Sequence, residues 1–168
     1  MQKEITKVIY RNAKLEDIPQ MLRVINGHAS RGLMLEKNRS DLLPLIPNFF
    51  VAELNSKIIG TCGYKIWLTA DIEIISSAVL EKYHGCGLGS RLNTEVINQA
   101  RSIGFSRFFI LTGRSDFYKK LNFYEIRKEE LSFKLYADCI KCKRNINKDP
   151  NFPLIADCPE VAMRLTFS

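Results

Sequence analysis

The sequence contains no long hydrophobic run, and no stretch approaches the roughly 18 to 20 consecutive apolar residues that cross a bilayer. Residues 1–7 also lack the apolar segment that an export signal requires. Internal repeats and low-complexity tracts are absent as well. From these absences we expect a soluble, cytoplasmic protein without a membrane partner.

Acidic residues are in the minority, because 18 Asp and Glu stand against 25 Lys and Arg and leave a formal net charge of +7. Such a balance attracts an anionic partner, for example a nucleic acid, an anionic membrane or a phosphorylated cofactor. Charge alone does not choose among them.

Cysteine occurs in an odd number, which does not suit a disulfide framework in a chain without an export signal. The five are Cys62, Cys86, Cys139, Cys142 and Cys158. The last three offer soft ligands for zinc, but a tetrahedral site would need a fourth ligand from an aspartate, a histidine or water. We therefore expect no bound metal, and keep zinc, a redox-sensitive pair and reduced thiols open for this segment. Cys62 is expected in the core.

The 168 residues, of which 46 % are hydrophobic and 26 % charged, suit one domain spanning 1–168. Hydrophobic periodicity predicts strands at residues 5–11, 49–54, 58–67, 71–80, 107–112, 123–127 and 161–167. It predicts helices at residues 18–29 and 39–45, between Gly89 and Gly104, and at 116–121. Ser40 is the expected N-cap of the second helix, and Ser115 or Asp116 of the last. Residues 134–160 are expected to form a cysteine-containing excursion on the surface.

The most informative segment joins a predicted strand to a predicted helix through Gly85, Gly87 and Gly89. A helix that begins after closely spaced glycines presents unpaired backbone N–H donors, so the segment is suited to bind phosphate. A nucleoside-triphosphate loop would continue with Lys and Ser or Thr, whereas Ser90 and Arg91 follow here. The dinucleotide pattern Gly-x-Gly-x-x-Gly does not match the strict alternation either. A tight turn without a ligand is the alternative.

The segment His84-Gly85-Cys86-Gly87-Leu88-Gly89 resembles the motif Arg/Gln-x-x-Gly-x-Gly/Ala of the GNAT family of N-acetyltransferases. The resemblance implies an α/β fold of the α+β type, with a mixed, mostly antiparallel central sheet of about six or seven strands and about four flanking helices. It also implies acetyl-CoA as cosubstrate. The loop would hold its diphosphate and the preceding strand its pantetheine arm, through Ala78, Val79, Leu80, His84, Gly85, Cys86, Gly87, Leu88, Gly89 and Ser90.

His84 departs from the Arg or Gln of that motif. Backbone donors survive the change, but the contribution of the side chain becomes weaker or pH dependent, since histidine titrates near neutrality. A solvated turn residue is the alternative. A helix N-terminus lowers the pKa of a thiol, which applies to Cys86, yet nothing assigns this residue as a nucleophile.

Two residues are candidates for acid–base chemistry. The family places an acid–base tyrosine in Phe-Tyr-x-Lys-x-Gly-Phe, which residues 117–123 match with Asn122 in place of glycine. The resemblance thus implies Tyr118 as the general acid that protects the leaving thiolate, with an ordinary helix tyrosine as the alternative and Tyr124 as a substitute. Glu73 lies in an otherwise apolar strand, and we expect it to be the general base, directly or through water. Asp71 lies two residues before Glu73, so both side chains would point to the same side of the strand. The alternative is therefore an exposed face or a strand edge that carries both carboxylates.

Most of the chain, from about Val8 to Leu165, is also similar to the short, single-domain N-acetylglutamate synthases of arginine biosynthesis. The agreement lies in Gly32-Leu33-Met34-Leu35, Phe49-Phe50-Val51, Glu73-Ile74, Ser76, Ala78-Val79, Leu111-Thr112, Glu130-Leu131, Ala137-Asp138-Cys139-Ile140-Lys141-Cys142, Cys158 and Glu160-Val161-Ala162-Met163. Departures are Glu36-Lys37 for Pro-Arg, Ile75 for Arg, and Gly113-Arg114-Ser115-Asp116 for Tyr-Gln-Pro-Glu. Lysine reproduces a bidentate arginine clamp poorly. The candidates to hold an acceptor carboxylate are Lys37 and Arg114, with Arg31 and Arg39 as reserves.

These residues predict acetyl transfer from acetyl-CoA to the amino group of a small amino acid, with L-glutamate as the expected acceptor, by direct attack on the thioester. The alternatives are another small amine as acceptor, or a CoA-binding regulator without turnover, because His84, Ile75 and Asn122 are departures. A basic nucleic-acid module over residues 134–148 is the third, but a solvated loop explains that run more simply, so no nucleic-acid partner is expected. We also expect a homodimer.

Overall fold

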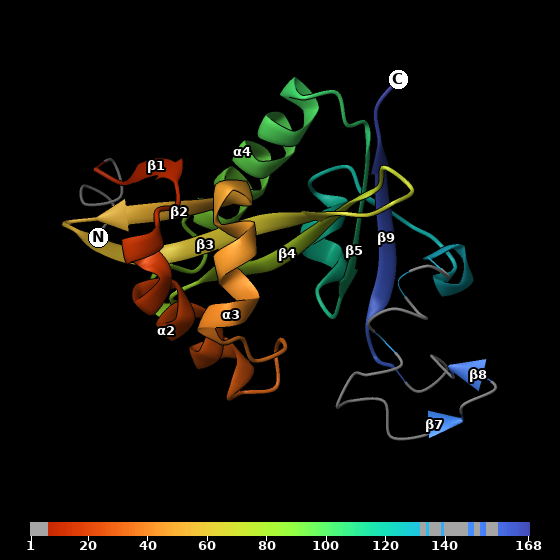
Figure 1. The fold of residues 1–168 in the computed structure, drawn as a ribbon, viewed down its shortest axis with the longest axis horizontal. Helices are drawn as coiled ribbons and strands as arrows, with labels where there is room; N and C mark the ends of the chain where they lie inside the picture. The colour runs from red at the N-terminus through yellow and green to blue at the C-terminus, as the bar shows by residue number, and fades with distance from the viewer. Residues whose placement is uncertain (1–6, 132–133, 135–138, 140–147, 150–151, 154–157) are drawn as a thin grey trace. The chain divides into compact units, whose positions relative to one another are not determined.

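The computed structural model describes residues 7–131, 134, 139, 148–149, 152–153 and 158–168. The chain divides into two compact units, of which the first comprises Met1–Phe108 with Thr166–Ser168 and the second Phe109–Leu165. Figure 1 shows the elements of both units. Among the described helices, none combines the length and the apolar character that a membrane crossing needs.

The first unit is built on four antiparallel strands in the order β1-β2-β3-β4, which span Ile9–Asn12, Phe49–Leu54, Lys57–Ile66 and Ile72–Val79. A two-residue turn joins β2 to β3, and there Asn55 and Ser56 adopt φ angles of 50° and 60°. Positive φ at both turn residues matches the right-handed twist of paired strands. The hairpin predicted from this segment is confirmed.

Helical segments of the first unit precede the hairpin and follow β4 (Figure 1). They are η1 (Leu15–Asp17), α2 (Ile18–Ala29), α3 (Arg39–Leu42), η2 (Leu43–Asn48), η3 (Glu81–Tyr83) and α4 (Leu88–Ser102). The predicted bounds of α2 are confirmed, but Asn38 and not Ser40 is the N-cap of α3. The extended backbone of Asn38 lets its Oδ1 accept the N–H of Asp41 at 3.1 Å, whereas Ser40 already lies inside the helix.

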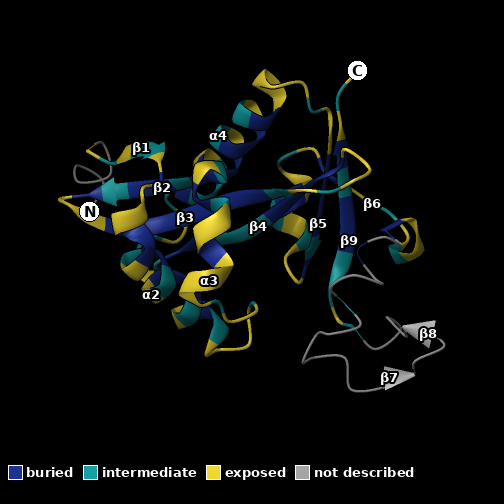
Figure 2. Ribbon diagram, viewed as in Figure 1, coloured by how far each residue is buried: buried dark blue, intermediate teal, exposed yellow. Residues whose placement is uncertain are grey.

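Side chains of β3 alternate between two layers of the first unit, and this strand is buried along most of its length (Figure 2). A Cβ on Gly63 would lie 2.7 Å from the ring of Phe49, which belongs to the apolar core formed with α2 and α3. Cys62, the preceding residue, instead contacts Asn93 of α4. The sheet therefore has one face packed on α2 and α3, called here the α2–α3 face, and an opposite face packed on α4.

Strand β4 carries a bulge that the sequence analysis did not predict. Thr61 pairs with Ala78 and Gly63 pairs with Ile75, so two residues of β4 oppose the single residue Cys62 of β3. Ser76, one of these two, has a φ of 50°. A bulge of this kind bends the strand and changes the direction of the side chains that follow it.

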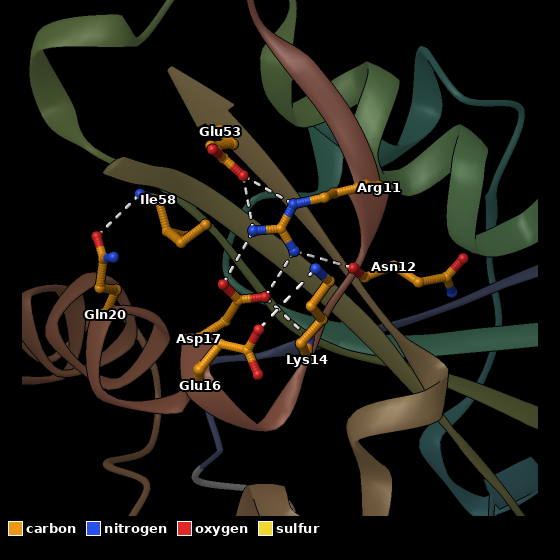
Figure 3. Close-up of polar contacts among 8 residues, drawn as sticks. All are labelled: Arg11, Asn12, Lys14, Glu16, Asp17, Gln20, Glu53 and Ile58. Carbon is orange, nitrogen blue, oxygen red and sulfur yellow. Dashed lines mark hydrogen bonds and ion pairs between the residues drawn. The ribbon is translucent and has the colours of Figure 1, made fainter. Parts of the chain in front are cut away.

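Within the first unit, Arg11 of β1 lies between two carboxylates and forms an ion pair with each of them (Figure 3). Arg11 donates Nη1 to Asp17 at 2.7 Å and Nε to Glu53 at 2.7 Å. The hydrogen bonds from Arg11 lower the pKa of the Asp17 carboxyl, and the N–H of Lys14 acts in the same direction, whereas burial acts against them. The same pairing raises the pKa of Arg11.

The second unit contains most of β5 (Arg107–Thr112) and of β9 (Val161–Thr166), with β6 (Tyr124–Glu125) beside β9. Tyr124 pairs with Arg164 in an antiparallel register. The other elements of this unit are α5 (Ser115–Lys119), η4 (Lys128–Leu131) and the short strands β7 (Lys148–Asp149) and β8 (Phe152–Pro153).

The expected fold class is confirmed, since the described strands include a mostly antiparallel set of seven, β1 to β6 and β9, together with the helices α2 to α5. Besides the N-cap of α3, two details of the prediction were wrong. Arg114, not Ser115 or Asp116, is the N-cap of α5, because the helix already begins at Ser115. β6 is also shorter than predicted and has two residues. Most of the expected excursion at 134–160 lies outside the described residues.

Candidate active site

The glycine loop has the backbone geometry of an anion-binding segment. Gly85 and Gly87 adopt φ angles of 75° and 79°, and Gly87 is the N-cap of the 15-residue helix α4. Such angles favour glycine over any L-residue with a Cβ. No atom lies within 4 Å of a Cβ built on either glycine, so the loop is open to an approaching group. The N–H groups of the first turn of α4 have no intrahelical acceptor, and the donor set therefore fits a diphosphate.

His84 is directed to the end of β4. Its Nε2 lies 2.8 Å from the carbonyl oxygen of Val79, and its ring centroid lies 5.8 Å from that of His28 in α2. The N–H of Leu80 donates to Ile59 of β3, so the backbone groups of Val79 point to the other edge of β4. Of the strand residues predicted to bind pantetheine, Val79 is thus the one directed away from β3, and in this structure His84 bonds its carbonyl.

A hollow of about 280 Å³ lies beside the start of the glycine loop. Its lining comes from the C-terminal part of α2 and from the residues that follow β4, namely Val24, Gly27, His28, Arg31, Leu80 and Glu81. Arg31 Nη1 lies 2.9 Å from Glu81 Oε2. Arg31, a reserve candidate for the acceptor carboxylate, is therefore ion-paired next to the predicted cofactor loop.

Glu73 is buried in the first unit, where only 8 % of the residue is exposed. It is the cross-strand partner of Lys65, two residues beyond Gly63, and so lies on the α2–α3 face. The indole Nε1 of Trp67 donates to Glu73 Oε2 at 3.0 Å. The neighbouring Asp71 is also buried and forms an ion pair with Arg107 at 3.1 Å. The alternative of an exposed face that carries both carboxylates was wrong, because Asp71 is only 7 % exposed and Glu73 only 8 %.

Tyr118 lies in the second unit, on α5, and only 4 % of it is exposed. Its ring packs edge-on against Phe117 and Phe123, with centroids at 4.9 Å and 5.4 Å. Asn122, which stands where the family motif has glycine, has a φ of 66°. Asparagine tolerates this left-handed conformation better than most residues, so the departure preserves the turn. Tyr124, the possible substitute, is half exposed on β6.

The candidates for an acceptor carboxylate lie in different places. Lys37 is half-buried in the segment between α2 and α3, where the side chain of Asn26 bonds both of its backbone groups. Arg39 begins α3. Arg114 is exposed in the second unit and lines a hollow of about 370 Å³ with Gly113, Ser115, Asp116, Phe117 and Lys120.

The cysteines differ in exposure. Cys62 is fully buried, which confirms its place in the core, and this burial raises the pKa of its thiol to about 12. Cys86 is half-buried, and its thiol donates to the carbonyl of His84 at 3.6 Å. Cys142 lies outside the described residues. Within the part of the chain that is described, no three His, Cys, Asp or Glu residues gather around a possible metal position.

Sequence reasoning missed Lys65, Trp67 and Asn26. Lys65 and Trp67 lie on β3 and just beyond it, and only the register of the hairpin shows that they share a face with Glu73. The bond from Asn26 to Lys37 spans 11 residues of irregular chain. No local pattern signals either relationship.

Comparison with known proteins identifies the class. The model of the acetyltransferase (GNAT) family matches residues 24–127. An uncharacterized N-acetyltransferase of Chlorobaculum tepidum is 31 % identical over 153 residues, which cover 91 % of this chain and 92 % of that protein. An amino-acid acetyltransferase of Mycobacterium tuberculosis is 29 % identical over 134 residues, covering 77 % of this chain and 76 % of that protein.

Solved structures share the fold. N-acetylglutamate synthase from Neisseria gonorrhoeae, in complex with coenzyme A and N-acetylglutamate, has a TM-score of 0.80 at 24 % identity, covering 96 % of this chain and 35 % of that chain. A Mycobacterium tuberculosis protein in complex with CoA has a TM-score of 0.74 at 24 % identity, covering 95 % of this chain and 99 % of that chain. The chain belongs to the GNAT family. It is an N-acetyltransferase that uses acetyl-CoA.

Proposed function

We propose that this enzyme acetylates the α-amino group of a small amino acid, with L-glutamate as the first acceptor to test. The observation that carries the proposal is the buried carboxylate of Glu73 on the α2–α3 face. The segment that contains Lys37 is hydrogen-bonded to α2, and α2 packs on the same face of the sheet. The names of relatives, among them amino-acid acetyltransferases, support the same acceptor class.

The proposed chemistry needs three proton transfers, two from the nitrogen and one to the thiolate. An amino acid arrives as an ammonium ion, and Glu73, directly or through a water molecule, takes a proton so that the nitrogen lone pair becomes available. The amine then attacks the thioester carbonyl, the C–N bond forms and the C–S bond breaks. Tyr118 donates its hydroxyl proton to the departing thiolate, and the second proton, which the nitrogen loses as the amide forms, restores the phenol. Net products are the N-acetylated amino acid, free CoA and one proton.

The glycine loop supplies binding and orientation in this proposal. Backbone N–H groups of Cys86 to Ser90 hold the diphosphate, and the N–H of Val79 pairs with the pantetheine arm. Lys37 and Arg114 are proposed to hold the acceptor carboxylate. Arg31 is the weaker candidate for that task, because its guanidinium already forms an ion pair with Glu81.

Glutamate is the finer part of the proposal, since the departures at Lys37, Ile75 and Arg114 fall where the resemblance places acceptor recognition. A second candidate is therefore another small amino acid or amine. A panel of the twenty amino acids and simple amines, offered with acetyl-CoA while release of free thiol is followed, tests both. If CoA binds saturably but no acceptor causes thiol release, the result would favour the alternative of a CoA-binding regulator without turnover.

The oligomeric state is a separate proposal. We propose a homodimer, and sedimentation equilibrium over a range of protein concentrations tests it. A single species with the mass of one chain, 19.3 kDa, would contradict it.

A further inference from the structure

We propose that Trp67 is a positioning residue for the general base. Its indole N–H holds one oxygen of Glu73 and so sets the direction in which the carboxylate meets the ammonium group of the acceptor. This inference rests on the proposed function, because it takes Glu73 as the base.

The register of β3 and β4 brings the two side chains together. Lys65 pairs with Glu73 and Ile66 pairs with Ile72, so positions 65, 67, 71 and 73 project from one face of this hairpin. Nε1 of Trp67 lies 3.0 Å from Oε2 of Glu73. This is the length of an ordinary N–H···O hydrogen bond, and an indole nitrogen acts only as a donor.

The backbone and the ring of Trp67 make further contacts besides the bond to Glu73. Its N–H donates to the carbonyl of Asp71 at 3.0 Å, and its carbonyl accepts the N–H of Ala70 at 2.9 Å. The ammonium of Lys65 lies 4.0 Å from the centroid of the indole ring, where a cation is attracted to the ring face. Backbone and ring are thus both restrained, and the N–H has a defined direction.

The two buried carboxylates of this face have different partners. Asp71 forms an ion pair with the guanidinium of Arg107 at 3.1 Å. Glu73 accepts a hydrogen bond from the indole N–H of Trp67, an uncharged donor that orients the carboxylate. On the described hairpin, Lys65 is the cross-strand neighbour of Glu73, and Asp71, which pairs with Arg107, lies two residues before it.

Trp67→Phe tests the bond itself, because phenylalanine keeps an aromatic ring for Lys65 but has no N–H. The variant removes the hydrogen bond by which the indole contacts the carboxylate. We expect the acidic limb of the pH profile of kcat/KM to move to higher pH, because a hydrogen bond to the ionised form of a carboxyl group favours that form. We also expect kcat/KM for the acceptor to fall about tenfold near neutral pH, while KM for acetyl-CoA stays unchanged.

The matched control is Leu68→Ala, at the fully exposed neighbour of Trp67 in the same turn. It perturbs the hairpin locally but leaves the N–H of Trp67 in place. We expect its pH profile and both KM values to equal those of the wild type.

A second measurement does not depend on catalysis or on the stability of the Phe variant. Trp67 is the only tryptophan of the chain, so the protein's tryptophan fluorescence reports the surroundings of this one indole. We expect the emission of the wild-type protein to titrate with the carboxyl group. Glu73→Gln keeps an oxygen acceptor for the indole but cannot ionise, and we expect the transition to disappear in this variant.

The outcomes separate the two proposals. Acetyl transfer by Trp67→Phe with an unshifted acidic limb, or an emission transition that persists in Glu73→Gln, overturns the positioning role and leaves the proposed function intact. An emission transition that depends on Glu73 together with no thiol release for any acceptor overturns the proposed function, and with it the role of Glu73 as base.

Discussion

The side-chain amide of Asn26 bonds both backbone groups of Lys37, donating Nδ2 to the carbonyl at 2.8 Å and accepting the N–H at Oδ1 at 3.0 Å. This pair of bonds restrains the segment that follows α2, because one side chain bonds both backbone groups of Lys37 as a neighbouring strand would. The position of the Lys37 ammonium therefore depends on a residue in a helix of the core.

We predict that Asn26→Ala raises KM for the amino-acid acceptor about fivefold to tenfold, because two hydrogen bonds of about 1 kcal/mol each no longer restrain Lys37. Ser30→Ala is the control, since it removes one side-chain bond to the backbone near the end of the same helix. In the background of Lys37→Met, Asn26→Ala should add little. Additive effects in steady-state kinetics would contradict a role through Lys37.

For Glu73→Gln we predict that kcat falls by roughly 10² to 10⁴, since the base is removed while the shape is kept. The decline of kcat/KM at low pH, which reports protonation of the base, should vanish. Asp71→Asn should keep that decline, because Asp71 pairs with Arg107 and is not the base. A pH profile of both variants between pH 5 and 9 checks this. An unchanged kcat in Glu73→Gln would show that this carboxylate is structural.

Tyr118→Phe should lower kcat by about tenfold to a hundredfold without loosening acetyl-CoA, because the thiolate departs without a proton donor while the ring stays packed. Tyr124→Phe, at the half-exposed tyrosine of β6, is the matched control and should be silent. Turnover and calorimetric binding of acetyl-CoA measure the two effects. Equal turnover in both variants would remove Tyr118 as the general acid.

The glycine loop predicts a contrast between two alanine substitutions. Gly87→Ala forces a Cβ into a left-handed conformation at a φ of 79° and should weaken acetyl-CoA binding about tenfold, with a stability loss of about 1 kcal/mol. Gly27→Ala, in the interior of α2 with no atom within 4 Å of the new Cβ, should stabilise the fold by roughly 0.5 to 1 kcal/mol. Calorimetry and thermal unfolding distinguish them, and equal losses in affinity would contradict a special role for the loop.

Folding stability should depend on pH through Asp17. Its pKa in the folded state lies below the ordinary value, so its contribution is fully present above pH 4 to 5 and is lost as the pH falls through the folded pKa. We predict that Asp17→Asn costs about 2 to 3 kcal/mol at pH 7, because Arg11 then loses a charged partner (Figure 3). The difference from the wild type should shrink toward pH 3. Urea unfolding at several pH values measures it, and a constant difference would contradict the linkage.

The sequence by itself determined the features that depend on neighbouring residues. The order of strands and helices, the open glycine loop before α4 and the tyrosine motif of α5 follow from periodicity, from glycine spacing and from a short resemblance, and the structure has each of them. Asn122 belongs to this group as well, since its left-handed conformation is a local property of asparagine.

Only the tertiary structure decided which side chains meet. The bulge at Ser76, the burial of Asp71, the bond from Trp67 to Glu73 and the bond from Asn26 to Lys37 all depend on the register between separate segments. A shift of one residue in that register would turn Glu73 to the opposite face of the sheet. Packing of the α2–α3 face selects the register, because only one alternation buries Phe49 over Gly63, and this selection cannot be read from either strand alone.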